Sequence, residues 1–399
     1  MSLRVLHAIS SLEPRAGSVA ITLPGLFRAL RANDIESSVV TADAYWPCYR
    51  DAATTPADPS HVAPSHATPS DHADVLRDAD VVHIHGWDAA LAIDIAGRAR
   101  AARKPYVVTP TGGLSTAPNR KKTWRDRLRG VFRERAALRW ASTLTALNSA
   151  ERDDLTRLGI ATRVVVLPYG LDVAAYADPV SDTHDIPPPP DGPFWLLLGP
   201  MHPVEGHVPL LKAVAELGDA CRDWRVVVAG TRTEDWRATL EAAVRRKGAT
   251  GRVVFTDAPD PPTQRALLAS AAVLVAPSLH IRNPVSVLQA AAAGVPVVAT
   301  TLVAPDDLAA VLHVCEPTYT GIRNAMRTVV ALTDEQRAHG AVEARELVRK
   351  TLDWSVLAEH YAALYRGVRG GSGGDHATCV GVGVGAAGSK NACKPKPPR

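Results

Sequence analysis

The segment of residues 277–301 joins a polar turn to the start of a helix, an arrangement that can hold an anion. Asn283 and Pro284 fit the N-cap and the first helical position, and Gly294 fits the left-handed residue that ends a helix. Arg282 directly precedes this helix start. Free N–H groups at a helix N-terminus attract anions, and a neighbouring cation strengthens that attraction.

Five histidines raise the question of a metal site: His83, His85, His202, His207 and His280. Metal-binding histidines of zinc enzymes commonly stand one helical turn apart, with a supporting acid. The stretches HIH and HPVEGH offer no such pair. We therefore expect these side chains to pack in the core or to cap helices, and we expect no metal in the site.

Short apolar runs rich in β-branched residues alternate with longer helical patterns, which is the rhythm of βαβ units around a parallel sheet. The predicted strands of the first half are residues 4–9, 38–41, 81–85, 106–109, 143–146 and 163–167. Those of the second half are 194–198, 225–229, 252–256, 273–276 and 295–299. The predicted class is α/β, with two doubly wound, Rossmann-like domains that face a central cleft.

Proline and glycine content suggests how the chain is divided. Residues 178–193 contain PPPPDGP and predict a stiff linker between an N-terminal domain, 1–177, and a C-terminal domain, 194–351. Residues 352–369 have a helical pattern. Residues 370–399 are rich in Gly, Ser, Lys and Pro, so a disordered tail is expected there.

Composition excludes several classes of protein. The chain has 399 residues, of which 46% are hydrophobic, and this length fits two ordinary domains. It shows no signal peptide and no apolar stretch of about 18 residues, so we expect a cytoplasmic protein with its five scattered cysteines reduced. A net charge of +4 without clustering does not predict nucleic-acid binding. Residues 9–20 lack the GxGxxG turn of an NAD-dependent oxidoreductase.

A basic segment, residues 119–140, has an amphipathic helical pattern. Its apolar face holds Trp124, Leu128, Val131, Phe132 and Leu138, and arginines and lysines cover most of the rest. One interpretation is a surface helix that buries its apolar face in its own domain. The other is peripheral contact with anionic lipid at the inner face of a membrane, or with an acidic acceptor.

Eight segments of the chain occur in the order and spacing of family 4 retaining glycosyltransferases, which the chain resembles over about residues 1–368. They are VVHIHGW (81–87), PYVVTPTGGL (105–114), VVVLPYGLD (164–172), LLLGPMHPVEGH (196–207), VVVAG (226–230), AAVLVAPS (271–278), AAAGVPVVAT (291–300) and LDWSVLAEHYAALY (352–365). The resemblance implies the GT-B fold, with the last helix returning to the N-terminal domain. It also implies sugar transfer from a nucleotide-diphosphate donor to a glycan or lipid-linked acceptor, often in surface polysaccharide synthesis, without a metal or other cofactor.

The chain departs from this family at positions that contact the donor. Two family glutamates, which touch the donor sugar and the ribose, are replaced by Ile281 and Gln289. A family histidine that touches the sugar is Thr111 here, and a glycine pair in the first loop is reduced to Gly17. Gln289 retains an amide that can bond a ribose hydroxyl, whereas Ile281 can make no polar contact.

The loop that binds the diphosphate in the family is altered as well. After Gly199, Pro200 and Glu205 stand where the family has an arginine and a lysine. A carboxylate at position 205 would repel the phosphates, so we consider Arg282 and Arg232 as replacement cations, the alternative being ordinary solvated arginines.

The resemblance thus implies donor contacts at Gly17, Gly199, Glu205, Arg232, Arg282, Asn283, Val285 and Gln289, with Thr111, Ile281 and Gln289 at the family's catalytic positions. Two functions stay open at this point. The first is an active sugar transferase with altered donor contacts. The second is a catalytically silent family member that binds a nucleotide sugar, a glycan or a partner transferase. Because a lost phosphate ligand typically costs about 2.7 to 4 kcal/mol of transition-state stabilisation, we expect turnover far below that of an intact family member.

Overall fold

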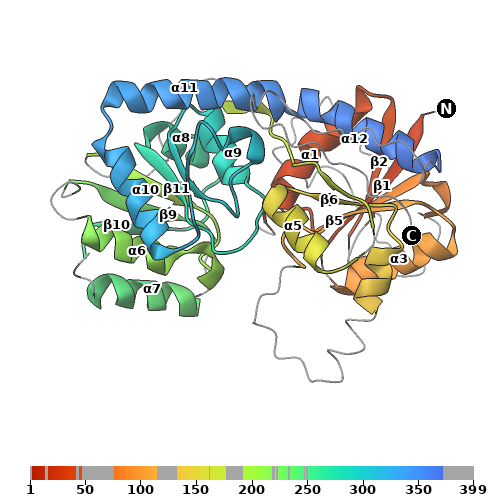
Figure 1. Cartoon of the computed structure of the whole chain (residues 1–399), viewed down its shortest axis with the longest axis horizontal. Coiled ribbons are helices and arrows are strands. Elements are labelled where there is room, and N and C mark those ends of the chain that lie inside the picture. Colours follow the sequence, from red (N-terminus) through yellow and green to blue (C-terminus); the bar gives the residue numbers. More distant parts are fainter. Residues whose placement is uncertain are drawn as a thin grey trace, which may run out of the picture.

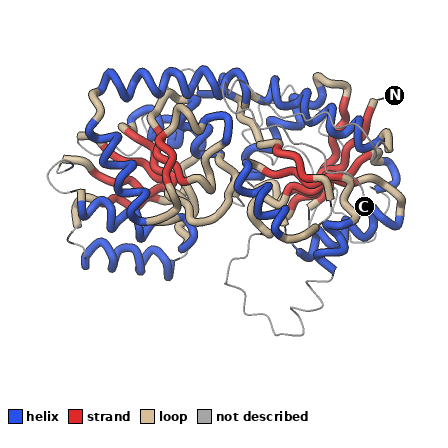
Figure 2. Tube along the Cα trace, in the orientation of Figure 1, coloured by secondary structure: helices blue, strands red, loops and turns tan. Residues whose placement is uncertain are grey.

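The protein is divided into two lobes that lie side by side (Figure 1). The computed structural model describes residues 2–13, 17–41, 45–46, 76–87, 89–114, 133–160, 162–176, 192–217, 221, 223–231, 234–246, 248 and 250–371. In each lobe a sheet forms the centre and helices cover its faces (Figure 2). This is the layered α/β arrangement that the alternating pattern of the sequence predicts.

The first lobe is built on a seven-stranded sheet in the order β3-β2-β1-β4-β5-β6-β7. The strands are β1 (Leu3–Ile9), β2 (Ile35–Val40), β3 (Tyr45–Trp46), β4 (Val81–His85), β5 (Tyr106–Thr109), β6 (Thr143–Ala146) and β7 (Val164–Val166). All neighbours are parallel except β2 and β3. The helices include α1 (Ser18–Arg31), α3 (Ala89–Ala101) and α5 (Ser149–Arg157). Every residue of β4, β5 and β6 is buried, as a parallel sheet covered on both faces requires.

The second lobe contains a six-stranded parallel sheet in the order β10-β9-β8-β11-β12-β13. Its strands are β8 (Phe194–Leu198), β9 (Arg225–Ala229), β10 (Val253–Thr256), β11 (Val273–Ala276), β12 (Val297–Thr300) and β13 (His313–Cys315). The helices are α6 (His207–Glu216), α7 (Glu234–Arg246), α8 (Pro261–Ser270), α9 (Val285–Ala292), α10 (Tyr319–Ala331) and α11 (Asp334–Thr351). This is the doubly wound order, in which the strands are added in one direction up to β10 and in the other direction from β11 onward, so the predicted fold class is confirmed.

The sequence located the buried strands better than those at the edges. The prediction missed β3, which has two residues, and β13, whose three residues contain a histidine and a cysteine in place of an apolar run. β3 and β13 are edge strands, which bury less surface, so their apolar signal is weaker. Inside the sheets, the prediction placed the start of β2 at residue 38 and the start of β12 at residue 295, whereas these strands begin at Ile35 and Val297.

The last described helix, α12 (Trp354–Arg369), continues from the end of α11 and packs on α1 of the first lobe (Figure 1). At its start Trp354 is 5% exposed. A Cβ atom at Gly25 would lie 2.4 Å from the indole, and one at Gly170 would lie 3.0 Å from it. Two glycines therefore make room for this tryptophan, which joins the lobes' shared apolar core.

We expect Trp354→Ala to destabilise the protein by about 3 to 5 kcal/mol, because it empties a site that the surrounding backbone cannot fill. Urea unfolding followed by circular dichroism measures this change. Trp140→Ala is the matched control: its ring is 50% exposed and stacks on Arg100, so we expect a loss under about 1 kcal/mol. Similar losses for both variants would contradict the packing role of Trp354.

Several predictions fall on residues outside the described part of the chain. These are nearly all of the linker, up to residue 191, the tail beyond Gly371, and positions 119–132 of the basic segment. Of its apolar face, only Leu138 is described, and it is buried. None of the described helices has the length and apolar character needed to cross a membrane. Membrane contact through residues 119–140 stays a prediction.

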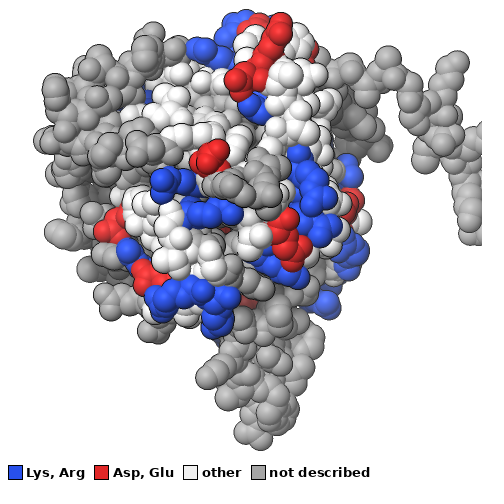
Figure 3. Space-filling view, turned by 90° about the vertical axis from the view of Figure 1, so that its left-hand side faces the viewer, with Lys and Arg blue, Asp and Glu red and all other residues white. Residues whose placement is uncertain are grey.

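Charges of both signs cover the end of the second lobe that Figure 3 faces. Lysines and arginines form several separate groups on this end, with acidic residues between them. Within helices of this lobe, Arg237 pairs with Glu241 on α7 and Arg337 pairs with Asp334 on α11. Arg323 of α10 pairs with Glu216 of α6.

Candidate functional site

The predicted donor residues of the second lobe meet where β8 and β11 end and α9 begins. Glycines allow this meeting. A Cβ atom at Gly230 would lie 1.8 Å from the Gly199 carbonyl oxygen. Gly206 has φ +75, and a Cβ atom there would lie 1.9 Å from the Pro277 carbonyl oxygen. Backbone therefore packs directly on backbone, at the edge of the sheet where open α/β folds bind ligands.

Arg282 and Glu205 form an ion pair at this edge. Arg282 Nε lies 3.1 Å from Glu205 Oε1, and the two side chains are 42% and 13% exposed. Burial raises the pKa of Glu205, and the Arg282 guanidinium opposes that rise. Arg282 therefore offsets the charge of Glu205, and the exposed part of its guanidinium can still contact an anion. Repulsion of phosphates by Glu205 and both interpretations of Arg282, a replacement cation and an ordinary solvated arginine, stay predictions.

Two histidines flank this ion pair. His202 and His280 have lowered pKa values, first because of burial and then because of the nearby Arg282 charge. The His202 ring also caps the short helix Pro203–Glu205, accepting a hydrogen bond from the Val204 N–H at 3.4 Å. Neutral imidazoles can donate hydrogen bonds to phosphate oxygens without adding charge to the site.

His207, the first residue of α6, is buried next to this site, and its side chain is 1% exposed. Burial lowers the pKa of His207 to about 4. A group that is neutral when folded but has a pKa near 6.5 when unfolded weakens folding as pH falls from about 6.5 toward 4.

We therefore expect wild-type stability to drop by up to about 3 kcal/mol over this pH range through His207 alone. In His207→Leu that part of the loss should vanish, because leucine does not titrate. Urea unfolding at pH 7, 6 and 5 measures the difference between the two proteins. Equal slopes with pH in both would contradict a buried, neutral His207.

The helix expected at residue 284 starts one residue later. Pro284 is the N-cap of α9, and no side chain caps this end. Asn283 does not cap it because its amide Nδ2 donates across the lobes to Thr22 Oγ1 of α1, at 3.4 Å. Val285 is thus the first helical residue. At the other end Gly294 has φ +74, as predicted for the residue that stops the helix.

Gln289 occupies the position expected to contact the ribose, but its amide is engaged within the protein. Its Oε1 accepts from Gln264 Nε2 at 2.6 Å, and its Nε2 donates to the Tyr176 hydroxyl at 2.8 Å. The side chain is 1% exposed. A ribose hydroxyl would have to exchange with one of these partners, so a direct contact at this position is not preformed.

At the family's sugar-contacting positions the structure places a backbone contact between the lobes. Gly112 has φ +77, and a Cβ atom there would lie 2.0 Å from the Ile281 carbonyl oxygen. Ile281 itself is buried. Thr111 has φ +52, a strained conformation for a β-branched residue and one that commonly marks a functional loop.

A buried carboxylate that the sequence reasoning missed holds this loop. Glu151 of α5 accepts hydrogen bonds from Gly112 N at 2.6 Å and from Leu147 N at 2.8 Å. Burial raises the pKa of Glu151, and these two backbone hydrogen bonds oppose the rise. The spacing of Asn148 and Glu151 at a helix start was the available signal, since Asn148 caps α5.

A second contact between the lobes lies at the start of α5, a helix on the side of the first lobe that faces the second lobe (Figure 1). The Asp306 carboxylate accepts from Ser149 N at 2.7 Å and from Ser149 Oγ at 2.8 Å. Asn148 Nδ2 lies 3.4 Å from the carbonyl oxygens of Leu302 and Ala304. Ser149 and Asp306 are 157 residues apart, so no local pattern could have predicted this contact.

The remaining predicted positions are less constrained. Gly17 precedes α1 with φ +131, and no described residue lies within 4 Å of where its Cβ would be, so within the described part of the chain a ligand can approach the backbone there. Gly199 likewise has φ +158 and open space at that position. Arg232 lies outside the described residues.

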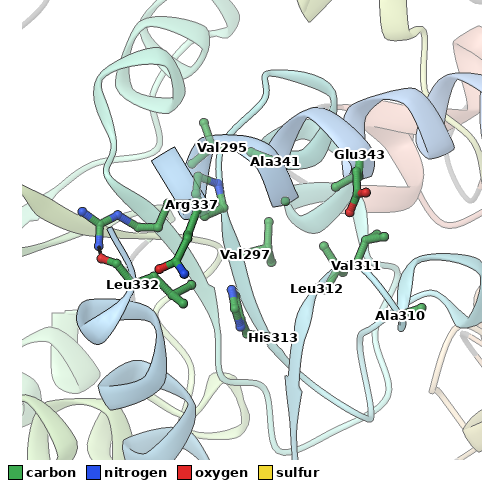
Figure 4. Close-up of a pocket in the computed structure, with 14 residues that line it drawn as sticks. Val295, Val297, Ala310, Val311, Leu312, His313, Leu332, Arg337, Ala341 and Glu343 are labelled. Carbon is green, nitrogen blue, oxygen red and sulfur yellow. Dashed lines mark hydrogen bonds between the residues drawn. The ribbon is translucent and has the colours of Figure 1, made fainter. Parts of the chain in front are cut away.

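A small pocket of about 190 Å³ lies at the opposite edge of the second sheet, where β12 begins (Figure 4). Its lining includes Val295, Val297 and Leu312, with Arg337 at one side. Arg337 donates to the Leu332 carbonyl at 2.6 Å and pairs with Asp334, so its charge is used within the protein. Because the pocket lies at the opposite edge of the sheet, it is separate from the donor site.

Comparison with known proteins agrees with this geometry. Residues 17–170 match the model of a glycosyl transferase 4-like domain, and residues 192–331 match that of glycosyl transferases group 1. The two matches cover more than half of the chain. The protein belongs to this glycosyltransferase family.

Curated relatives of this glycosyltransferase match only in part. One is 2-deoxystreptamine glucosyltransferase of Streptomyces kanamyceticus, 32% identical over 55% of this chain and 59% of the relative. Another is GDP-mannose:cellobiosyl-diphosphopolyprenol alpha-mannosyltransferase of Xanthomonas oryzae, 27% identical over 55% of this chain and 56% of the relative. The chain thus spans less than two thirds of the length of the curated relatives it matches.

The solved structures establish the fold of this glycosyltransferase over nearly its whole length. Sucrose-phosphate synthase from Thermosynechococcus elongatus superposes with a TM-score of 0.68 at 18% identity, covering 93% of this chain and 100% of the other. At this identity the likeness concerns the fold alone. The two-lobed architecture expected from the sequence is therefore confirmed.

Proposed function

We propose that this glycosyltransferase transfers a hexosyl group from a nucleotide-diphosphate sugar to a hydroxyl group, with Arg282 as the cation that meets the diphosphate. The observation that carries the proposal is the Arg282–Glu205 ion pair at the carboxyl end of the sheet. The acid Glu205 stands where the family has a lysine, and the cation Arg282 directly follows position 281, where the family has an acid. One positive side chain therefore remains beside the uncapped start of α9.

In the proposed reaction the acceptor hydroxyl oxygen bonds to the anomeric carbon of the donor. The bond between that carbon and the diphosphate oxygen breaks, and its electron pair leaves with the nucleoside diphosphate, which also takes up the hydroxyl proton. Arg282 and the N–H groups of α9 stabilise the negative charge that grows on the diphosphate. Because protein groups stabilise that charge, we propose that no metal takes part in this step.

The relatives supply the substrate classes of the proposal. One is named for glucosyl transfer to 2-deoxystreptamine, and another for transfer of mannose from GDP-mannose to a lipid-linked diphosphate acceptor. We therefore propose a glycan or lipid-linked acceptor, with retention at the anomeric carbon as in the family that the chain resembles. A lipid-linked acceptor would bring the protein to a membrane surface, where the basic residues 119–140 are the candidate contact.

A product assay tests the proposal. Purified protein is incubated with GDP-mannose or UDP-glucose and with aminocyclitol or diphosphate-lipid acceptors. We expect release of the nucleoside diphosphate that depends on acceptor, and a product whose anomeric configuration, read by NMR, matches the donor. Absence of turnover across the panel would favour a catalytically silent binding protein, and an inverted product would contradict the retaining reaction.

A further inference from the structure

Three histidine rings lie together in the core of the first lobe. His7 comes from β1, and His83 and His85 come from β4. The register of the two parallel strands pairs His7 directly with His83, and the alternation along β4 puts His83 and His85 on the same face. One ring nitrogen from each histidine lies within 4.8 Å of the other two. The three side chains are at most 2% exposed.

Hydrogen bonds hold the rings in place but leave one nitrogen without a partner. His83 contacts the Tyr365 hydroxyl of α12 and Thr109 Oγ1, each at 2.7 Å. His85 contacts the Tyr169 hydroxyl at 2.6 Å through Nδ1, and His7 Nδ1 at 2.9 Å through Nε2. His7 Nε2 is buried and has no hydrogen-bond partner among the residues that the structure describes. Buried polar atoms are rarely left in this state, so the contacts within the protein do not fully satisfy the cluster.

We propose that His7, His83 and His85 bind one divalent transition metal ion, with Zn²⁺ the best match, which anchors α12 to the first lobe. Imidazole nitrogens are preferred ligands of zinc, and three histidines with one further position are a common coordination set. The second nitrogen of a metal-bound histidine usually bonds a hydroxyl, carbonyl or carboxylate. Tyr169 stands in that role for His85 and Tyr365 for His83, and the bond from the other His83 nitrogen to Thr109 would give way to the ion.

The link from His83 to Tyr365 connects the site to α12, so the ion would fix the helix that joins the two lobes. This site is separate from the proposed donor site and does not depend on the proposed reaction.

The test uses the full-length protein expressed in medium supplemented with Zn²⁺ or Co²⁺, because the site is too deeply buried for rapid entry after folding. Mass spectrometry of the metal should find about one ion per chain. His7→Leu and His83→Gln should each lower the metal content below about a tenth of an ion per chain. His207→Leu alters a buried histidine of the other lobe and should leave the metal content unchanged. Tyr365→Phe should retain the ion but release it to a chelator about 10 to 100 times faster.

The absorption spectrum of the Co²⁺-loaded protein distinguishes histidine ligands from cysteine ligands. Histidine ligation predicts visible bands without the near-ultraviolet absorption of a cobalt–thiolate bond. Wild-type protein that holds less than about a tenth of an ion after loading would overturn the proposal whether or not the variants fold. A thiolate band would overturn it, and so would folded His7→Leu and His83→Gln proteins with undiminished metal.

Discussion

Arg282→Ala should lower kcat/KM for a nucleotide-sugar donor by about 10² to 10³, because it removes the side-chain cation from the place where charge grows on the leaving diphosphate. The kcat/KM of Arg282→Lys should lie between that of Arg282→Ala and that of the wild type. Lysine keeps the charge but loses the planar geometry that lets one guanidinium contact Glu205 and a phosphate together. Steady-state kinetics with GDP-mannose and UDP-glucose as trial donors measures both variants.

Arg327→Ala provides the control for this experiment. Arg327 is exposed on α10, in the same lobe but on a helix that contributes nothing to the donor site. Its removal changes net charge by the same amount and should leave kcat/KM within about twofold of the wild type. If Arg282→Ala and Arg327→Ala have the same effect, Arg282 does not act on the diphosphate.

Gly112→Ala should move the two lobes apart where they are in contact. The new methyl group would lie 2.0 Å from the Ile281 carbonyl oxygen, so the loop and the second lobe cannot keep their present contact. We expect a larger radius of gyration in small-angle X-ray scattering and at least about a tenfold loss of kcat/KM, since small misplacements of reacting groups are costly.

Gly159→Ala separates this effect from backbone strain. Gly159 has φ +66, similar to Gly112, but nothing lies within 4 Å of the added methyl group. Its substitution should cost about 1 kcal/mol of stability and leave the radius of gyration and turnover unchanged. If both variants keep the wild-type radius of gyration, the Gly112–Ile281 contact does not hold the lobes together.

The sequence predicted the class and most strands because buried parallel strands are continuous apolar runs that need no knowledge of their neighbours. Leu196, Val227 and Leu274 illustrate this: each sits in such a run, and each is at most 2% exposed. Edge strand β13, with His313 and Cys315, carries no such signal. Its place depends on pairing with β12, which the sequence does not display.

The site was harder to predict than the fold because its contacts join distant segments. The Arg282–Glu205 ion pair depends on the loops after β8 and β11 packing backbone on backbone. His7 lies within the apolar strand β1 and becomes part of a histidine cluster only through the register of β1 with β4. The sequence was enough to assign Gln289 to its helix. It did not predict the hydrogen bond from Gln289 to Tyr176, because Tyr176 lies before the linker, far away in the chain.

Isothermal titration calorimetry with wild-type protein and Arg282→Gln tests the central claim most directly, using GDP and UDP beside guanosine and uridine. If Arg282 contacts the diphosphate, the wild type binds GDP or UDP. The Arg282→Gln variant then binds the same nucleotide at least about tenfold more weakly, as expected for the loss of a charged hydrogen bond. Binding of the matching nucleoside should not change. Absence of diphosphate binding by the wild type, or equal weakening for diphosphate and nucleoside, would contradict the account.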